Sequence, residues 1–272
     1  MIMPGMRVSS LIAAPLALLA ACGPAASNST ADEPSAQQAA RQGAETVQLR
    51  AADGVSVHAV HYAADQPRAV ILLFHQANGS AAEYAPIAPR LAAAGFESLA
   101  IDQRSGGQMF GPNRTVAGQG RSSEFLAAEP DLEAALAWAR SRKLPVIVWG
   151  SSYSAALVFR LASRHPGEIA GVVAFSPGEY LGAPRLVREA ASRVTAPIFA
   201  AAASDAREQA AVRMILAASP SQTKTAYIPL KGGTHGSSTL DAARNPDGAG
   251  PAWTSITTFL DRLLPKSSPS AP

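Results

Sequence analysis

The chain has 272 residues, of which 47% are hydrophobic and 16% are charged, and its formal net charge is +3. This length suits one large α/β domain or two small ones, and the hydrophobic share is enough for a sizeable core. The basic residues are scattered and form no dense run, which argues against nucleic acid as a partner.

The first 21 residues predict an export signal. Arg7 precedes an apolar stretch at 11–21 that is too short to cross a bilayer. The stretch ends with LAAC at 19–22, and small residues directly before a cysteine resemble the lipobox of bacterial lipoproteins. Cys22 is the only cysteine, and Gly23 follows it where enteric lipoproteins retained at the inner membrane carry aspartate. We therefore expect a signal peptide at 1–21 and lipidation of Cys22. The protein would then be anchored in the bacterial cell envelope, at the outer membrane on its periplasmic side. The alternative is a soluble secreted protein.

Composition divides the rest of the chain into three parts. Residues 22–45 are rich in Ala, Ser, Gln and Pro without periodicity, which predicts a flexible tether. Residues 46–264 carry regular patterns and are expected to form one folded domain. The segment 265–272 is expected to be a disordered tail.

Within 46–264, strand patterns alternate with helix patterns. Segments 46–49 and 55–61 alternate in polarity around Asp53-Gly54, which is typical of a β-hairpin. Further strands are expected at 69–74, 97–101, 145–149, 169–175, 198–203 and 224–228. Helices are expected at 82–94, 131–142, 152–164, 181–193, 207–217 and 252–263. This alternation predicts an α/β fold with a mostly parallel sheet, helices on both faces and functional groups at the carboxyl ends of the strands.

The segment 146–156 carries the strongest functional signal. A β-branched apolar run ends at Gly150, Ser152 follows two positions later, and a helix of small residues begins at once. This order is typical of a nucleophile elbow, the sharp turn that exposes a serine hydroxyl above a parallel sheet. The usual pattern has glycine at both crowded positions, so Ser154 is a departure. The alternative is an ordinary strand followed by a serine N-cap.

Two further residues complete a candidate catalytic triad. Asp205 directly follows the 198–203 strand, and His235 lies in a glycine-flanked loop after the last strand. An imidazole can remove the proton of a serine hydroxyl, and a carboxylate behind it fixes its tautomer. We therefore expect Ser152, His235 and Asp205 to act together, with Glu179 as the alternative acid. Taken singly, Asp205 could cap the next helix and His235 could be an ordinary loop residue.

These residues and their order resemble the α/β-hydrolase superfamily over about residues 47–264. Segment 72–80 looks like the family's oxyanion loop, segment 96–106 like its D-x-R-G turn, and segment 164–173 like the region after the elbow helix. The short spacing between Phe175 and Ile198 resembles the compact dienelactone-hydrolase-like and small carboxylesterase branches. The resemblance implies that 46–264 is an α/β-hydrolase catalytic domain with an eight-stranded sheet and no large lid domain.

The resemblance also implies an oxyanion hole made of two backbone N–H groups. One belongs to Tyr153, and alignment of the loop places the other at Ala77, with Gln76 as the fallback because it replaces a glycine. Possible substrate-binding residues are Gln76, Arg104, Phe110 and Tyr180. The arginines of the 102–128 loop would form an anion-recognising wall, or simply a solvated surface.

The expected function is that of a serine hydrolase with an acyl-enzyme intermediate. Its substrate would be a small molecule with a carboxylic ester, lactone or thioester bond. No cofactor is implied, and the histidines and carboxylates show no metal-ligand spacing. A peptidase or amidase of the same fold is one alternative, and a lipase acting on membrane lipid is another. A non-catalytic envelope lipoprotein that uses the scaffold as a binding module is the alternative outside catalysis.

Overall fold

The computed structural model describes residues 43–265. The expected signal peptide, Cys22, most of the expected tether and all but the first residue of the expected tail lie outside the described residues. Within 43–265, no helix combines the length and the apolar character needed to cross a membrane.

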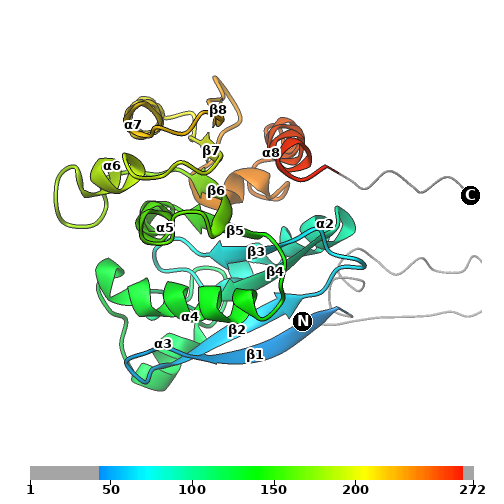
Figure 1. The fold of residues 1–272 in the computed structure, drawn as a ribbon, viewed down its shortest axis with the longest axis vertical. Helices are drawn as coiled ribbons and strands as arrows, with labels where there is room; N and C mark the ends of the chain where they lie inside the picture. Colours follow the sequence, from blue (N-terminus) through cyan, green and yellow to red (C-terminus); the bar gives the residue numbers. More distant parts are fainter. Residues whose placement is uncertain (1–42, 266–272) are drawn as a thin grey trace, which may run out of the picture. The chain divides into compact units, whose positions relative to one another are not determined.

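Eight strands form one sheet in the order β1-β2-β4-β3-β5-β6-β7-β8 (Figure 1). Their bounds are β1 Ala44–Arg50, β2 Ser56–Tyr62, β3 Ala69–Phe74, β4 Phe96–Ile101, β5 Val146–Ser151, β6 Ile169–Phe175, β7 Ile198–Ala201 and β8 Lys224–Tyr227. The β1–β2 hairpin is antiparallel and joins β4 in the antiparallel sense, whereas every pairing from β4 to β8 is parallel. The predicted mostly parallel, eight-stranded sheet is confirmed. Strand β1 begins inside the expected tether.

Helices cover both faces of this sheet and enclose two apolar cores. The helices are η1 Ala81–Tyr84, α2 Ala88–Ala93, α3 Arg114–Gln119, η2 Phe125–Ala128, α4 Glu129–Arg140, α5 Tyr153–Arg164, α6 Leu186–Ala191, α7 Ala206–Ala218, η3 Gly236–Leu240 and α8 Ala249–Leu263. One core joins the sheet to α4, α5, α6 and α7, and the other joins it to η1, α2 and α8. Residues such as Leu157 and Phe159 of α5 are fully buried, and each such side chain contributes about 1.5–3 kcal/mol.

The structure differs from the expected elements at two places before β5. The helix expected at 82–94 is two short helices, η1 and α2, with Pro86 between them; proline lacks the N–H that a continuous helix needs. The long loop expected at 102–128 contains α3, whose first turn is capped by the Asn113 side chain accepting the Val116 N–H. Helix α3 ends at Gly120, which has a left-handed φ of 75°.

The topology gathers several loops at one edge of the sheet. Strands β3, β5, β6 and β7 are parallel neighbours, so their carboxyl ends meet at the same edge. The segments that leave these ends begin at His75, Ser152, Ser176 and Ala202. The loop after β8 carries His235 to the same edge, where its side chain contacts Ser152.

Candidate active site

Ser152 lies on a strained turn between β5 and α5. Its φ and ψ are 58° and −120°, a region that residues other than glycine rarely adopt. Gly150 leaves room for this turn, because a Cβ there would lie 2.3 Å from the Ser154 carbonyl oxygen. The Ser154 hydroxyl donates to the His75 carbonyl at 2.6 Å and accepts from Gln103 Nε2 at 2.9 Å. Serine at the second small position therefore ties the turn to two neighbouring loops.

His235 joins the Ser152 hydroxyl to a carboxylate. Its Nε2 is 2.7 Å from Ser152 Oγ, and its Nδ1 is 2.6 Å from Glu208 Oε1. Ser152 is 7% exposed, while the His235 side chain is 43% exposed, so the imidazole lies at the mouth of the site. The three groups form a chain of hydrogen bonds along which a proton can pass from serine to histidine.

The carboxylate beside His235 is not the one expected from the sequence. Asp205 is the N-cap of α7, and its Oδ1 accepts the backbone N–H groups of Arg207 and Glu208. Glu208 lies one turn further along the helix, where its side chain reaches His235. The pattern D-x-x-E at 205–208 is typical of a helix N-terminus whose first residue is the cap. This pattern was the sequence feature that could have indicated Asp205 as a cap and left Glu208 as the acid.

The charges of this arrangement stabilise each other. Burial opposes ionisation of Glu208, but hydrogen bonds from His235 and from the Ala203 N–H hold its pKa below the usual range. The hydrogen bond to Glu208 raises the pKa of His235 above its ordinary value, and partial burial opposes this. The pair therefore favours a protonated imidazole beside an ionised carboxylate, which is the charge state that follows proton transfer from serine.

Two backbone N–H groups near the nucleophile in the sequence or in the predicted oxyanion loop have no hydrogen-bond acceptor among the described residues. Neither Ala77 nor Tyr153 donates a backbone hydrogen bond to any residue in the range 43–265. The Gln76 N–H is different, because it donates to Glu83 Oε2 at 2.7 Å. The predicted oxyanion-hole pair, Ala77 and Tyr153, therefore stays a prediction with which these hydrogen bonds are compatible, whereas the N–H of the fallback donor Gln76 already has an acceptor.

The loop that carries Ala77 is held by His75, which is fully buried. Its Nε2 accepts the Gln103 N–H at 3.0 Å, so the ring proton lies on Nδ1 and donates to the Gln76 carbonyl at 2.8 Å. Burial lowers the pKa of His75, consistent with this neutral tautomer. The Gly79 N–H also donates to the Gln76 carbonyl, which closes the turn.

Two other predicted residues have structural partners instead of site contacts. Glu179, the alternative acid, accepts the N–H groups of Val187 and Arg188 at the start of α6 and pairs with the Arg188 side chain. Arg104 was predicted to bind substrate, but it is 6% exposed and its guanidinium is bound by Asp131 and Asp53. With its donors engaged in this buried ion pair, Arg104 stabilises the domain core near α4.

The remaining predicted substrate-binding residues are Gln76, Phe110 and Tyr180. Gln76 Nε2 contacts Met109 Sδ at 3.0 Å, and its Oε1 is buried with no hydrogen-bond partner in the described chain. The Phe110 ring is covered by the Arg244 guanidinium at 4.6 Å. Tyr180 follows β6 and is 36% exposed; burial of its hydroxyl and the nearby Glu208 and Asp205 charges raise its pKa to about 12.

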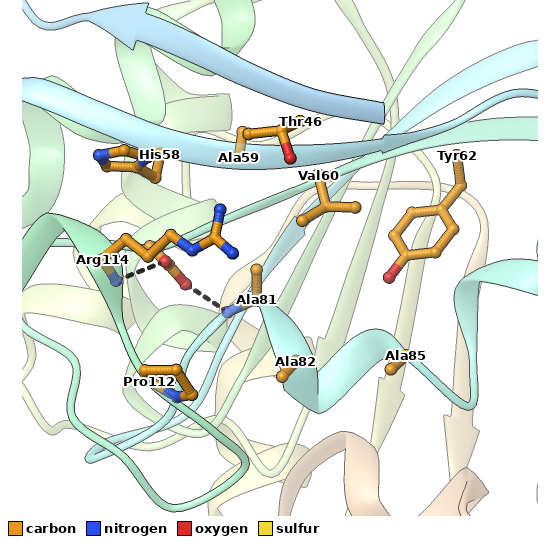
Figure 2. Close-up of a pocket in the computed structure, with 11 residues that line it drawn as sticks. Thr46, His58, Ala59, Val60, Tyr62, Ala81, Ala82, Ala85, Pro112 and Arg114 are labelled. Carbon is orange, nitrogen blue, oxygen red and sulfur yellow. Dashed lines mark hydrogen bonds between the residues drawn. The ribbon is translucent and has the colours of Figure 1, made fainter. Parts of the chain in front are cut away.

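A separate cavity of about 240 Å³ lies between β2 and η1. Figure 2 shows Thr46, Tyr62, Ala81 and Arg114 around it. The Asp102 carboxylate accepts the backbone N–H groups of Ala81 and Arg114. Ser152, His235 and Glu208 are not part of its lining. Within residues 43–265, no three His, Cys, Asp or Glu side chains gather in a way that could hold a metal ion.

A mostly parallel eight-stranded sheet with a serine on a strained strand-to-helix turn beside a histidine defines the α/β-hydrolase class. Residues 65–229, more than half of the chain, match the family model of the serine aminopeptidases S33. The chain therefore belongs to this hydrolase family. The matched region includes Ser152 and Glu208 and ends before His235. A search of curated proteins gives no match.

Solved structures show the same fold. A dienelactone hydrolase from Anabaena variabilis is 17% identical, with a TM-score of 0.62 over 81% of this chain and 98% of that one. An esterase from Pyrococcus furiosus is 20% identical, with a TM-score of 0.57 over 81% and 91%. A monoglyceride lipase from Saccharomyces cerevisiae is 14% identical, with a TM-score of 0.62 over 82% and 96%. In the present chain, the segment between β6 and β7 holds only the short helix α6 and loops, with no large lid.

Proposed function

We propose that the protein is a serine hydrolase that cleaves carboxylic esters or related acyl bonds through an acyl-enzyme. The observation that carries this proposal is the chain of hydrogen bonds from Ser152 Oγ through His235 to Glu208, at 2.7 and 2.6 Å. Membership of a hydrolase family supports it, and so do the esterase, lipase and dienelactone hydrolase names of the structural neighbours.

In the proposed reaction, His235 Nε2 removes the Ser152 proton as Oγ attacks the substrate carbonyl carbon. The oxyanion that forms is bound by the N–H groups of Ala77 and Tyr153. The imidazolium gives its proton to the leaving oxygen, and the carbon–oxygen bond of the leaving group breaks. A water molecule, deprotonated by His235, then attacks the acyl-enzyme, and the acid product leaves as Ser152 regains its proton.

A peptidase or amidase is a second candidate, because the family is described as serine aminopeptidases. The two activities differ in the leaving group, an alcohol or an amine. Hydrolysis of p-nitrophenyl acetate and butyrate should be compared with that of aminoacyl p-nitroanilides. Esters hydrolysed at least ~100-fold faster, as kcat/KM, would support the ester proposal; faster anilide cleavage would replace it with the peptidase candidate.

The first experiment is labelling by a fluorophosphonate, which reacts with activated serines. Wild type is expected to be labelled, and Ser152→Ala to be unreactive. The matched control is Ser163→Ala, which removes another serine of the same region whose hydroxyl only donates to the Arg160 carbonyl. A folded wild type that resists labelling would reject the hydrolase proposal and favour the binding-module alternative.

We also propose that the protein is exported and lipidated on Cys22, with a tether before the 46–264 catalytic domain. The LAAC sequence at 19–22 supports this proposal. Mass spectrometry of the membrane fraction should find a mature chain that begins at an acylated Cys22. Cys22→Ala should leave the protein unlipidated, and an unmodified wild-type cysteine would contradict the proposal.

A further inference from the structure

Glu83 is a buried carboxylate that the proposed reaction does not use. It lies on η1, is 3% exposed and forms no ion pair with residues in the described part of the chain. Its Oε2 accepts the Gln76 N–H at 2.7 Å, and its Oε1 accepts the Ser151 hydroxyl proton at 2.6 Å. A buried carboxylate without a cationic partner is costly, so its retention here calls for a reason beyond packing.

The contacts of Glu83 join three segments of the site. Gln76 directly precedes Ala77, the proposed oxyanion donor, and Ser151 directly precedes Ser152. Ser151 Oγ also accepts the Ser237 N–H at 2.9 Å, and Ser237 lies two residues after His235. One carboxylate therefore links the oxyanion loop, the nucleophile turn and the histidine loop through hydrogen bonds.

We propose that Glu83 is a positioning residue whose ionised carboxylate holds these three segments in register and adds a negative charge behind His235. This inference rests on the proposed function, since it assigns Glu83 a role in the same site. Glu83 does not touch the reacting atoms and acts through Gln76, Ser151 and Ser237.

The hydrogen bonds of Glu83 distinguish its two protonation states. A proton on Oε2 would face the Gln76 N–H, which is itself a donor, so the proton must lie on Oε1. There it would donate to Ser151 Oγ, which already accepts from Ser237. The Ser151 proton would then lose its acceptor. Because a hydroxyl oxygen has two lone pairs, Ser151 Oγ can still accept from Ser237. Protonation of Glu83 therefore reverses its hydrogen bond with Ser151, leaves the Ser151 proton without this acceptor and replaces the charge-assisted bonds of Glu83 by weaker neutral ones, which loosens the link between η1 and the other two segments.

This change falls in the neutral pH range. Burial raises the pKa of Glu83 to about 7, although the hydrogen bonds from Ser151 and Gln76 act in the opposite direction. The charged groups that face it are His235 and Arg244, which both favour its ionised form. Burial raises the pKa of the Tyr84 and Tyr153 phenols, and the Glu83 charge acts in the same direction, so neither tyrosine adds a charge beside Glu83.

The test is the pH dependence of fluorophosphonate labelling, measured as a second-order rate constant from pH 5 to 9. In wild type, both His235 and Glu83 must lose a proton for full reactivity, so the rate should fall more steeply than first order as pH decreases. Glu83→Gln should fall with first-order slope and a lower midpoint, because the Glu83 charge that raises the His235 pKa is gone. At pH 8 its rate should be about 10- to 100-fold below wild type, the effect of misplacing catalytic groups.

Two further variants keep this test decisive. Glu179→Gln also neutralises a carboxylate that accepts backbone N–H groups, but away from His235, and should retain the wild-type profile. Ser151→Ala removes a hydrogen bond that lowers the Glu83 pKa, so its acid limb should move to higher pH, opposite to Glu83→Gln. If Glu83→Gln fails to fold, the proposal is tested by the direction in which Ser151→Ala shifts the pH profile of labelling.

The role of Glu83 would be overturned if folded Glu83→Gln showed the slope and midpoint of the wild-type pH profile. It would also be overturned if the acid side of the Ser151→Ala profile did not move to higher pH. These results are distinct from failure of the proposed function, in which wild type would not be labelled at any pH.

Discussion

Two single variants, Glu208→Gln and Asp205→Asn, test which carboxylate supports His235. Glu208 is in contact with His235 in the structure, whereas Asp205 is the acid expected from the sequence. Glutamine retains the size of Glu208 but has no charge, and its amide group can face His235 Nδ1 and favour the wrong tautomer. The Glu208 side chain is 16% exposed, so solvent does not replace the lost charge. A carboxylate-to-amide change behind a catalytic histidine costs up to ~10⁴-fold in kcat.

We therefore expect Glu208→Gln to lower ester hydrolysis by about 10³- to 10⁴-fold, equivalent to about 4–5.5 kcal/mol of transition-state stabilisation. Asp205→Asn should change the rate by less than about twofold, since asparagine caps a helix as well as aspartate does. Its free energy of unfolding should change by less than about 0.5 kcal/mol.

Both variants should be assayed with p-nitrophenyl butyrate at pH 8 and by urea unfolding. The urea experiment ensures that a slow variant is folded. The reasoning is refuted if Glu208→Gln retains more than a tenth of the wild-type rate, or if Asp205→Asn loses activity to the same extent.

Three other predictions concern the site and its support. The kcat/KM of wild type should fall with decreasing pH at a midpoint above 6.5, because the base must be neutral and hydrogen bonding to its carboxylate raises the His235 pKa; a midpoint below 6.5 would contradict this. Arg104→Met should lower the free energy of unfolding by about 3–5 kcal/mol, measured in urea, because Asp131 remains buried without its cation, while labelling of the folded fraction should not change. Gly150→Ala should destabilise the fold by at least about 2 kcal/mol, since its Cβ would meet the α5 backbone at 2.3 Å, whereas Gly118→Ala meets no atom within 4 Å and should be neutral or stabilising in a thermal melt.

The fold was predictable because each buried strand is a short apolar run between turn signals. Segment 69–74 is expected as a strand and is β3 with the same bounds, fully buried. The errors arose where a local feature interrupted the pattern. Pro86 divides the helix expected at 82–94, and the capping side chain of Asn113 begins α3 inside an expected loop.

The site was predictable only as far as local motifs extend. Ser152 and His235 each have a sequence context that indicates a role, and the structure places them in contact. Asp205 and Glu208 both follow the same strand, and the choice between them depends on which side chain reaches His235 once α7 has begun, which the local sequence does not determine. The partners of Arg104 come from segments 27 and 51 residues away, which no local pattern joins to it.

The attachment of η3 has a consequence for how the chain matures. Ser237 accepts from Trp149 Nε1 at 2.9 Å and donates its N–H to Ser151, so the histidine loop is fastened onto β5 only after nearly the whole domain has been made. A nascent or truncated chain that stops before residue 235 lacks the base that contacts Ser152. Under the proposed mechanism, such a chain is chemically inert. Fluorophosphonate labelling would therefore report whether the histidine loop has reached β5, the last contact that the proposed mechanism needs.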